Sequence, residues 1–280
     1  MIEIIFLFSI AAIWMLFGAV ADLKYRIVPN WLNFSLIIFS FGTRFFYSLF
    51  LGDFNFFYQG LIGFGIFFIA GNALYYGRMF SGGDAKLMIA LGAILPMSES
   101  FFINIGNFAM FFILFLFTGA AYGMFSITYL SLKNFRKFKK EFGKQINGNK
   151  NKIYLAMFFG IAILIFAFYE KTFFYLGIIV FFLPYFYFYA KAVDESCMIK
   201  IVETKYLTEG DWLCNSLKIK GKRIKSRWEG LSKEEIKLIR KKFKKVKIRD
   251  GVPFEPAFLI AFLIYAAFLL NGINLLGLIY

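Results

Sequence analysis

The chain contains no histidine, only two cysteines and few charged residues, and each shortage excludes a kind of chemistry. Without histidine there is no His-ligated metal site, no serine–histidine catalysis and no imidazole general base. Cys197 and Cys214 form no CxxC motif, so a reduced compartment is expected rather than a disulfide framework. We therefore expect a protein that needs neither a metal nor another cofactor.

Most of what is present is apolar. Hydrophobic residues make up 60% of the 280 residues, aromatic residues make up 22%, and the mean hydropathy is +0.67. Only 18% of the residues are charged, against about 25% in an average globular protein. A water-soluble fold of this size would expose large apolar patches. The composition therefore excludes intrinsic disorder and predicts an all-α polytopic membrane protein.

Apolar stretches of suitable length predict about eight transmembrane helices, since one span needs roughly 20 residues. They cover residues 4–21, 31–51, 56–76, 85–96, 101–131, 153–169, 173–190 and 256–279. The stretch 85–96 is short, about 18 Å as a helix. It either extends beyond Pro96 or lies where the protein shields its ends.

In a soluble protein, a net charge of +15 would suggest nucleic-acid binding. In a membrane protein, it indicates basic loops that are held on the cytoplasmic side. If the end of the first span is inside and the spans alternate, every Lys and Arg except Arg44 and Lys171 lies in an inner segment. Those segments are 22–30, 77–86, 132–152 and 191–255. We therefore expect a multi-pass protein of the plasma membrane, with both termini outside, that contacts lipid and no nucleic acid.

This topology divides the chain into five expected parts. They are a membrane core at 1–131, a basic cytoplasmic loop at 132–152, a transmembrane hairpin at 153–190, a small cytoplasmic segment at 191–255 and a last transmembrane helix at 256–280. Within the cytoplasmic segment, the partial alternation of 214–220 predicts a strand. A capping box at Ser232–Glu235 predicts a basic amphipathic helix at 232–245. That helix faces either anionic lipid headgroups or a substrate or partner.

With histidine absent, carboxylates are the natural candidates for catalysis. Asp22 ends the first span and Asp84 opens the fourth, and the predicted topology places both at the cytoplasmic boundary. Each alone has a structural interpretation, because Asp22 can pair with Lys24 or Arg26 and Asp84 can cap its helix. Together, two carboxylates from different helices can hold a water molecule, one taking its proton and the other donating to a substrate carbonyl.

The residues around Asp84 suit this chemistry. Gly82 and Gly83 carry no Cβ, so they either let a substrate backbone approach Asp84 closely or let the loop adopt a positive φ. Lys24, Arg26 and Lys86 would favour the ionised form of a nearby carboxylate. Because the carboxyls of Asp22 and Asp84 would interact, the observed pKa values would belong to the two residues as a pair and not to either residue alone.

Two motifs and the tail resemble a known family. The motifs are Asp22-Leu23-Lys24-Tyr25-Arg26-Ile27-Val28-Pro29-Asn30 and Ser81-Gly82-Gly83-Asp84-Ala85-Lys86, and the tail is Asp250-Gly251-Val252-Pro253-Phe254-Glu255-Pro256-Ala257-Phe258 after a polar segment expected to be rich in helix. The sequence resembles the archaeal type IV prepilin-like and preflagellin peptidases, which are GxGD-type aspartyl proteases. Ser81 stands where that motif has its first glycine. The resemblance implies a six-helix peptidase core, to which the 153–190 hairpin is an addition.

The resemblance implies a membrane endopeptidase that cleaves the short leader of prepilin-like or preflagellin-like membrane proteins, which carry class III signal peptides. Its catalytic residues would be Asp22 and Asp84, and the motif residues that support them would be Gly82, Gly83, Lys86, Lys24, Arg26, Pro29 and Asn30. Acids that could bind a basic leader are Asp194, Glu195, Glu203, Glu209 and Asp211.

Two other functions compete with this one. A presenilin-like or signal-peptide-peptidase-like protease places its acids deeper in the bilayer. A transporter or channel carries acids or broken helices near the membrane midplane. The sequence does not assign the base and the acid between Asp22 and Asp84, nor does it identify the substrate or the oligomeric state.

Overall fold

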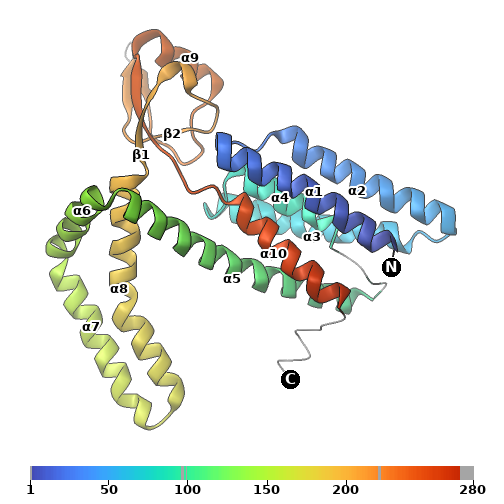
Figure 1. Ribbon diagram of the computed structural model, residues 1–280, viewed down its shortest axis with the longest axis horizontal. Coiled ribbons are helices and arrows are strands. Elements are labelled where there is room, and N and C mark those ends of the chain that lie inside the picture. The colour runs from blue at the N-terminus through green and yellow to red at the C-terminus, as the bar shows by residue number, and fades with distance from the viewer. Residues whose placement is uncertain (1, 96–97, 99, 220–221, 272–280) are drawn as a thin grey trace. The chain divides into compact units, whose positions relative to one another are not determined.

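The computed structural model describes residues 2–95, 98, 100–219 and 222–271 (Figure 1). Within this part, six helical segments are long and apolar enough to cross a membrane. They are α1 (Ile2–Tyr25), α2 (Asn30–Leu51), α3 (Asn55–Tyr76), α5 (Phe101–Lys133), α7 (Lys150–Ile165) with the 3-10 turn η1 (Phe166–Phe168), and α8 (Lys171–Cys197). The prediction of an all-α polytopic membrane protein is confirmed.

The chain divides into two compact units, and α5 runs from the first into the second. The first unit comprises residues 1–124 and 253–280, and the second comprises 125–252. The first unit contains α1, α2, α3 and the beginning of α5, together with the shorter helices α4 (Gly82–Gly92) and α10 (Glu255–Leu270). In this bundle α10 packs along α1, while α2 and α3 pack against α4 (Figure 1).

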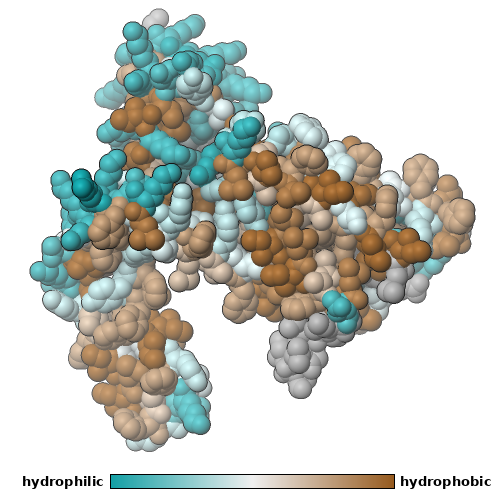
Figure 2. All heavy atoms as spheres, in the orientation of Figure 1, coloured by the Kyte–Doolittle hydropathy of each residue, from teal (hydrophilic) through white to brown (hydrophobic). Residues whose placement is uncertain are grey.

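Aromatic rings fill the centre of the first unit. Phe115 and Phe258 lie 4.3 Å apart between ring centroids, and Phe8 meets Phe262 edge-on at 5.2 Å. Buried contacts of this kind hold apolar helices together without requiring polar partners. Many apolar side chains remain exposed, and Figure 2 shows hydrophobic residues over much of the visible face of this unit. Such a surface requires lipid as its solvent.

Helix α4 is too short to cross a bilayer by itself. Its 11 residues span about 16 Å, against roughly 30 Å of hydrocarbon. The helix ends at Gly92, where the following carbonyls bind the buried guanidinium of Arg44, so the protein shields this end. Pro96 lies outside the described residues. The eightfold crossing, which includes α4 and α10, stays a prediction.

The stretch 132–152, which we expected to be a loop, is mostly helix. Helix α6 (Phe135–Gly148) has an apolar edge on which Phe138 is buried and stacks on Phe142, with ring centroids 5.4 Å apart. Phe138 also meets Tyr189 of α8 at 5.1 Å. The basic residues occupy the rest of the helix surface, so a charge run that looked like a loop is one face of an amphipathic helix.

Helices α7 and α8 form a hairpin over the residues for which one was expected (Figure 1). Two glycines allow their backbones to approach. A Cβ at Gly160 would lie 2.8 Å from the amide nitrogen of Phe181, and a Cβ at Gly177 would lie 2.6 Å from Leu164. Close approach at small residues is a common means of helix association in membranes.

The polar segment after α8 folds largely as β structure, which corrects the expectation of a helix-rich segment. Its elements are β1 (Ile199–Glu203), the 3-10 turn η2 (Thr204–Tyr206), β2 (Trp212–Leu213), β3 (Leu217–Ile219), β4 (Lys222–Ile224), α9 (Lys233–Lys242) and β5 (Lys245–Arg249). Strands β1, β5 and β2 form an antiparallel sheet in that order, and β3 pairs with β4 as a hairpin. The predicted strand at 214–220 corresponds to the shorter β3.

Helix α9 begins at the capping box that the sequence indicated. The Ser232 hydroxyl accepts from the Glu235 N–H at 3.3 Å, and the Glu235 carboxylate accepts from the Ser232 N–H at 3.0 Å. The helix ends at Lys242, three residues earlier than expected, because β5 begins at Lys245. Its buried residues Ile236 and Ile239 belong to the same apolar cluster as Val246 of β5, which gives this segment its own small core.

Candidate active site

Asp22 lies in the last turn of α1 and is half-buried. Its carbonyl accepts from the N–H of Arg26 at 2.9 Å, and Arg26 adopts a left-handed φ of 60° that ends the helix. Pro29 is extended and immediately precedes Asn30, the first residue of α2. The connection between α1 and α2 is therefore short, and Asp22 stands directly before it.

Asp84 lies in the first turn of α4, where it completes a capping box with Ser81. The Ser81 hydroxyl accepts from the Asp84 N–H at 3.4 Å, and Asp84 Oδ2 accepts from the Ser81 N–H at 3.1 Å. The hydroxyl thus supplies a cap that a glycine at this position would lack. The departure from the GxGD pattern has a local physical reason, and one carboxylate oxygen of Asp84 is held in place.

The two glycines before Asp84 leave space beside it. Neither is among the residues with a positive φ in the described part of the chain, so loop conformation does not account for them. A Cβ on Gly83 would lie 3.7 Å from Val28 and from the Ser81 hydroxyl, and one on Gly82 would lie 3.8 Å from Tyr75. Of our two expectations, a positive φ is therefore wrong, and close approach of a peptide backbone to Asp84 stays a prediction.

Two basic residues of the motifs, Lys86 and Lys24, contact groups other than carboxylates. Lys86 Nζ donates to Asn30 Oδ1 at 2.7 Å, which joins α4 to the start of α2. Lys24 Nζ lies 5.1 Å from the centroid of the Tyr25 ring. These contacts make Asn30 and Lys86 a structural link between the two motifs.

The structure brings Asp22 and Asp84 close enough for their charges to interact, although they come from different helices. A third acid joins them. Glu255 is the first residue of α10, its main-chain N–H donates to Asp22 Oδ2 at 3.2 Å, and its carboxyl interacts with both aspartates. Glu255 belongs to the tail motif, but the sequence pattern indicated no function for it. An acid directly before Pro256 at the start of an apolar run was the available signal.

Asp84 and Glu255 stand ahead of the apolar residues of their helices, and their environment favours the protonated forms. Burial raises the pKa of Asp84 to about 6; hydrogen bonds from Ser81 oppose this shift and the Asp22 charge adds to it. Burial also raises the pKa of Glu255, to about 8, and the charges of Asp84 and Asp22 add to this shift. Across the described residues, no three or more His, Cys, Asp or Glu side chains are spaced to hold a metal ion.

Each acid that we expected to bind a basic leader has a partner inside the second unit. Asp194 pairs with Arg249 at 3.1 Å, and Glu195 accepts from Gln145 at 2.7 Å. The remaining pairs are Glu203 with Lys205, Glu209 with Lys233, and Asp211 with the Thr208 main chain and hydroxyl. These acids are thus already paired within the segment, and the binding of a leader by them stays a prediction.

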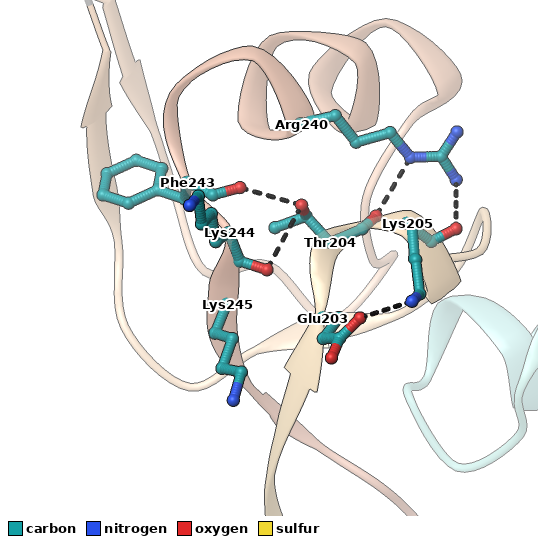
Figure 3. A pocket seen from close by; sticks show the side chains of 7 residues that line it. All are labelled: Glu203, Thr204, Lys205, Arg240, Phe243, Lys244 and Lys245. Atoms are coloured by element: carbon teal, nitrogen blue, oxygen red, sulfur yellow. Dashed lines mark hydrogen bonds and ion pairs between the residues drawn. The ribbon is translucent and has the colours of Figure 1, made fainter.

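A pocket of about 350 Å³ lies between η2 and the end of α9 (Figure 3). Figure 3 shows that its polar groups are largely paired with one another. The Arg240 guanidinium donates to the carbonyls of Thr204 at 3.0 Å and Lys205 at 3.2 Å, and the Thr204 hydroxyl donates to the Phe243 carbonyl at 2.8 Å. The pocket therefore joins α9 to the sheet and offers little unpaired chemistry.

Comparison with known proteins bears on the region that holds both aspartates. Residues 9–125 match the type IV leader peptidase family. The predicted resemblance is confirmed. Over 89 residues the chain is 30% identical to the preflagellin peptidase of Methanocaldococcus jannaschii, an alignment that covers 32% of this chain and 38% of that relative. The chain thus matches about two fifths of the length of this curated relative. No solved structure matches the chain.

The leader peptidase match ends within α5. It includes the motifs around Asp22 and Asp84, but not α6, the α7–α8 hairpin, the small β segment or α10. Glu255 therefore lies outside the residues that the family accounts for.

Proposed function

We propose that this protein is a membrane aspartyl endopeptidase that removes the short leader of prepilin-like or preflagellin-like membrane proteins. The observation that supports the proposal is the electrostatic influence of Asp22, at the end of α1, on Asp84, at the start of α4, within the stretch that matches type IV leader peptidases. The curated relative, a preflagellin peptidase, matches over a part of its length and supports the same substrate class.

The proposed reaction uses water as the nucleophile. One ionised carboxylate of the Asp22–Asp84 pair takes a proton from the water, and the other, protonated carboxyl donates to the oxygen of the scissile carbonyl as it becomes tetrahedral. Mutual repulsion separates the two pKa values, so that the pair holds one proton over a range of pH. The titration belongs to the pair, and neither residue is assigned as the base.

The position of the acids suits a leader junction. Asp22 and Asp84 lie at helix ends and not in the middle of an apolar span. A substrate with a polar leader followed by a long apolar helix would place its junction at this level, with the helix in lipid and the leader in water. The glycines beside Asp84 leave space for a locally extended backbone. The distribution of Lys and Arg favours the cytoplasmic side for this site.

Separate Asp22→Asn and Asp84→Asn variants test the proposal in membranes with a leader-bearing preflagellin-like substrate. Each change removes one proton carrier, so cleavage should fall by about a hundredfold or more. Asp53→Asn is the matched control, because Asp53 lies just before α3, where it accepts from the Asn55 N–H at 2.9 Å, and Asn retains an acceptor. If both site variants are folded and still cleave the leader, the aspartate pair is not the catalyst.

The same experiment separates the competing functions. Mass spectrometry of the products locates the cut. A cut at the junction between leader and apolar helix supports a leader peptidase, whereas a cut within the apolar helix supports a presenilin-like protease. If the wild-type protein cleaves neither, and ion or solute flux depends on the two aspartates, transport is the better explanation.

A further inference from the structure

Helix α6 packs where two neighbouring helices reach the end of their apolar stretches (Figure 1). Tyr189 stands near the end of the apolar stretch of α8, two residues before Lys191. The Phe138 ring of α6 meets the Tyr189 ring at 5.1 Å, and the hydroxyls of Tyr189 and Ser131, near the end of α5, lie 2.8 Å apart. Tyrosine is common at the boundary between membrane and water, so we expect α6 to lie at that boundary.

The beginning of α7 lies at the same level. Helices α7 and α8 run antiparallel, and Gly160 of α7 lies against Phe181 of α8. The same register places Lys152, near the start of α7, opposite Tyr189. One residue joins α6 to α5 and one joins it to α7, so α6 begins and ends close to the level at which the apolar stretches stop.

The charge of this region is strongly one-sided. Residues 132–152 include eight Lys and Arg and a single acid, Glu141. Lys137, Lys140 and Lys144 are spaced three and four residues apart, so they share one side of α6, and all three are exposed. We call these three lysines the basic face of α6. The apolar edge that packs on α8 lies on the other side of the helix.

The acids beside α6 do not neutralise this face. Gln145 Nε2 donates to Glu141 at 3.0 Å and to Glu195 at 2.7 Å, and Lys144 pairs with Glu141 at 3.3 Å. The two other lysines of the basic face have no acid partner in the part of the chain that the structure describes. Like charges four residues apart on a helix repel each other, so an anion bound to this face would stabilise α6.

We propose that the basic face of α6 binds the phosphates of anionic phospholipid headgroups. Leu132 and Phe135, directly before this face in the chain, are 67% and 54% exposed. A lipid surface offers phosphate to the lysines and hydrocarbon to these two side chains, whereas a soluble acidic partner would meet only the charge. The surface lies outside residues 9–125, which match the leader peptidase family, and goes beyond the proposed cleavage.

The first test measures lipid binding to the full-length protein in detergent micelles by native mass spectrometry. Phosphatidylglycerol, which is anionic, and phosphatidylcholine, which has no net charge, are the probes. The double variant Lys137→Gln and Lys140→Gln should bind phosphatidylglycerol about tenfold more weakly than the wild type and phosphatidylcholine equally well. The double variant Lys137→Arg and Lys140→Arg keeps both charges and should bind as the wild type does. Equal binding of phosphatidylglycerol by the glutamine variant and the wild type overturns the proposal.

Helix α9 provides the matched control. Lys237 and Lys241 are exposed and four residues apart on it, so changing both to Gln removes the same charge from another basic helix. This variant should bind phosphatidylglycerol as the wild type does. An equal loss in both variants would show that net charge alone attracts the lipid and would overturn the proposal. Binding of a fluorescent polyglutamate peptide that is lost only from the α6 glutamine variant, with lipid binding unchanged, would assign the face to a soluble acidic partner instead.

The second test locates α6 relative to the bilayer. The protein carries one spin label, with Cys197 and Cys214 changed to Ser, in vesicles of phosphatidylglycerol and phosphatidylcholine. A label at Lys139→Cys, which leaves the basic face intact, should be relaxed by a lipid that chelates nickel at its headgroup. A label at Ile161→Cys, in the apolar stretch of α7, should be relaxed by oxygen instead. If the label at 139 responds only to a water-soluble nickel chelate, α6 lies away from the lipid and the proposal is wrong.

Discussion

Arg44 offers the sharpest test of how α4 is held. Its guanidinium is fully buried and donates to three carbonyls, those of Ala93 at 2.7 Å, Phe56 at 2.7 Å and Ile94 at 2.9 Å. It also lies 4.3 Å from the centroid of the Phe56 ring. A cation at the carboxyl end of α4 is favoured by the helix dipole as well as by these hydrogen bonds.

The expected loss can be estimated from these contacts. Hydrogen bonds from a charged donor contribute about 1.5–3 kcal/mol each, while burying the guanidinium costs several kcal/mol. Arg44→Met removes three such hydrogen bonds and leaves three carbonyls without this donor. It also removes the cost of burying the guanidinium, which offsets part of the loss. We expect a net loss of about 3 kcal/mol in the free energy of unfolding, because the buried carbonyls of Ala93 and Ile94 after α4 lose their charged donor. Arg44→Lys should lose about half as much, since a single ammonium does not span all three carbonyls.

Thermal unfolding of the purified protein in detergent or lipid measures this effect. A loss of about 3 kcal/mol corresponds to a fall of roughly 6–12 °C in Tm for a domain of 150–250 residues. Arg136→Met is the matched control, because Arg136 is exposed on α6. If the Tm of Arg44→Met lies within about 2 °C of that control, the three hydrogen bonds do not hold α4 and the reasoning is wrong.

Two further predictions concern the cap of α4 and the topology. Ser81→Ala should lower the free energy of unfolding by about 1 kcal/mol, and Ser81→Gly should lower it by only a few tenths. The Tm should therefore be highest for the wild type, lower for Ser81→Gly and lowest for Ser81→Ala. Equal Tm values would show that the Ser81 hydroxyl does not stabilise the helix. The topology can be tested with a membrane-impermeant maleimide in a background in which Cys197 and Cys214 are changed to Ser. Asp53→Cys should be labelled in intact cells, and Lys233→Cys only after permeabilisation. The reason is that the positive-inside rule places the loop between α2 and α3 outside and α9 inside. The opposite labelling pattern would reverse the orientation.

The long helices of the membrane part were predictable because lipid imposes a simple pattern. Runs of about 20 apolar residues have few alternatives to a helix when every backbone group needs an internal partner. The predicted span 31–51 and the observed α2 (Asn30–Leu51) differ by one residue. The same argument fails for 132–152, where Phe138 and Phe142 carry the helical periodicity but the basic residues between them dominate the composition.

The β structure of the polar segment was missed although one signal was present. In β5, Val246 and Ile248 are buried while Lys245 and Lys247 are exposed, which is the period of a strand. The partners of β5 lie at Ile199–Glu203 and at Trp212–Leu213, and local pattern does not reveal such distant pairings. The basic composition drew attention to charge and away from this alternation.

At the site, sequence could predict the residues that stand in motifs but not those that tertiary packing supplies. Asp22 and Asp84 stood out because topology alone placed both at one boundary. Glu255 contacts Asp22 through a fold that joins residues 233 positions apart, and Gly18 matters only because Glu255 reaches it. Arg44 stood out in the charge count as an exception, and its function became evident only with the carbonyls that it binds.

The anchoring of α4 at both ends makes it a spacer of fixed length. Ser81 holds its first turn, Arg44 holds the carbonyls after its last, and Lys86 ties its flank to Asn30. One residue inserted between Asp84 and Ala93 would turn the carboxylate by about 100° and displace it by about 1.5 Å relative to Arg44. The number of residues in this helix therefore sets the direction in which Asp84 faces, and apolar exchanges inside it matter less than a change in its length.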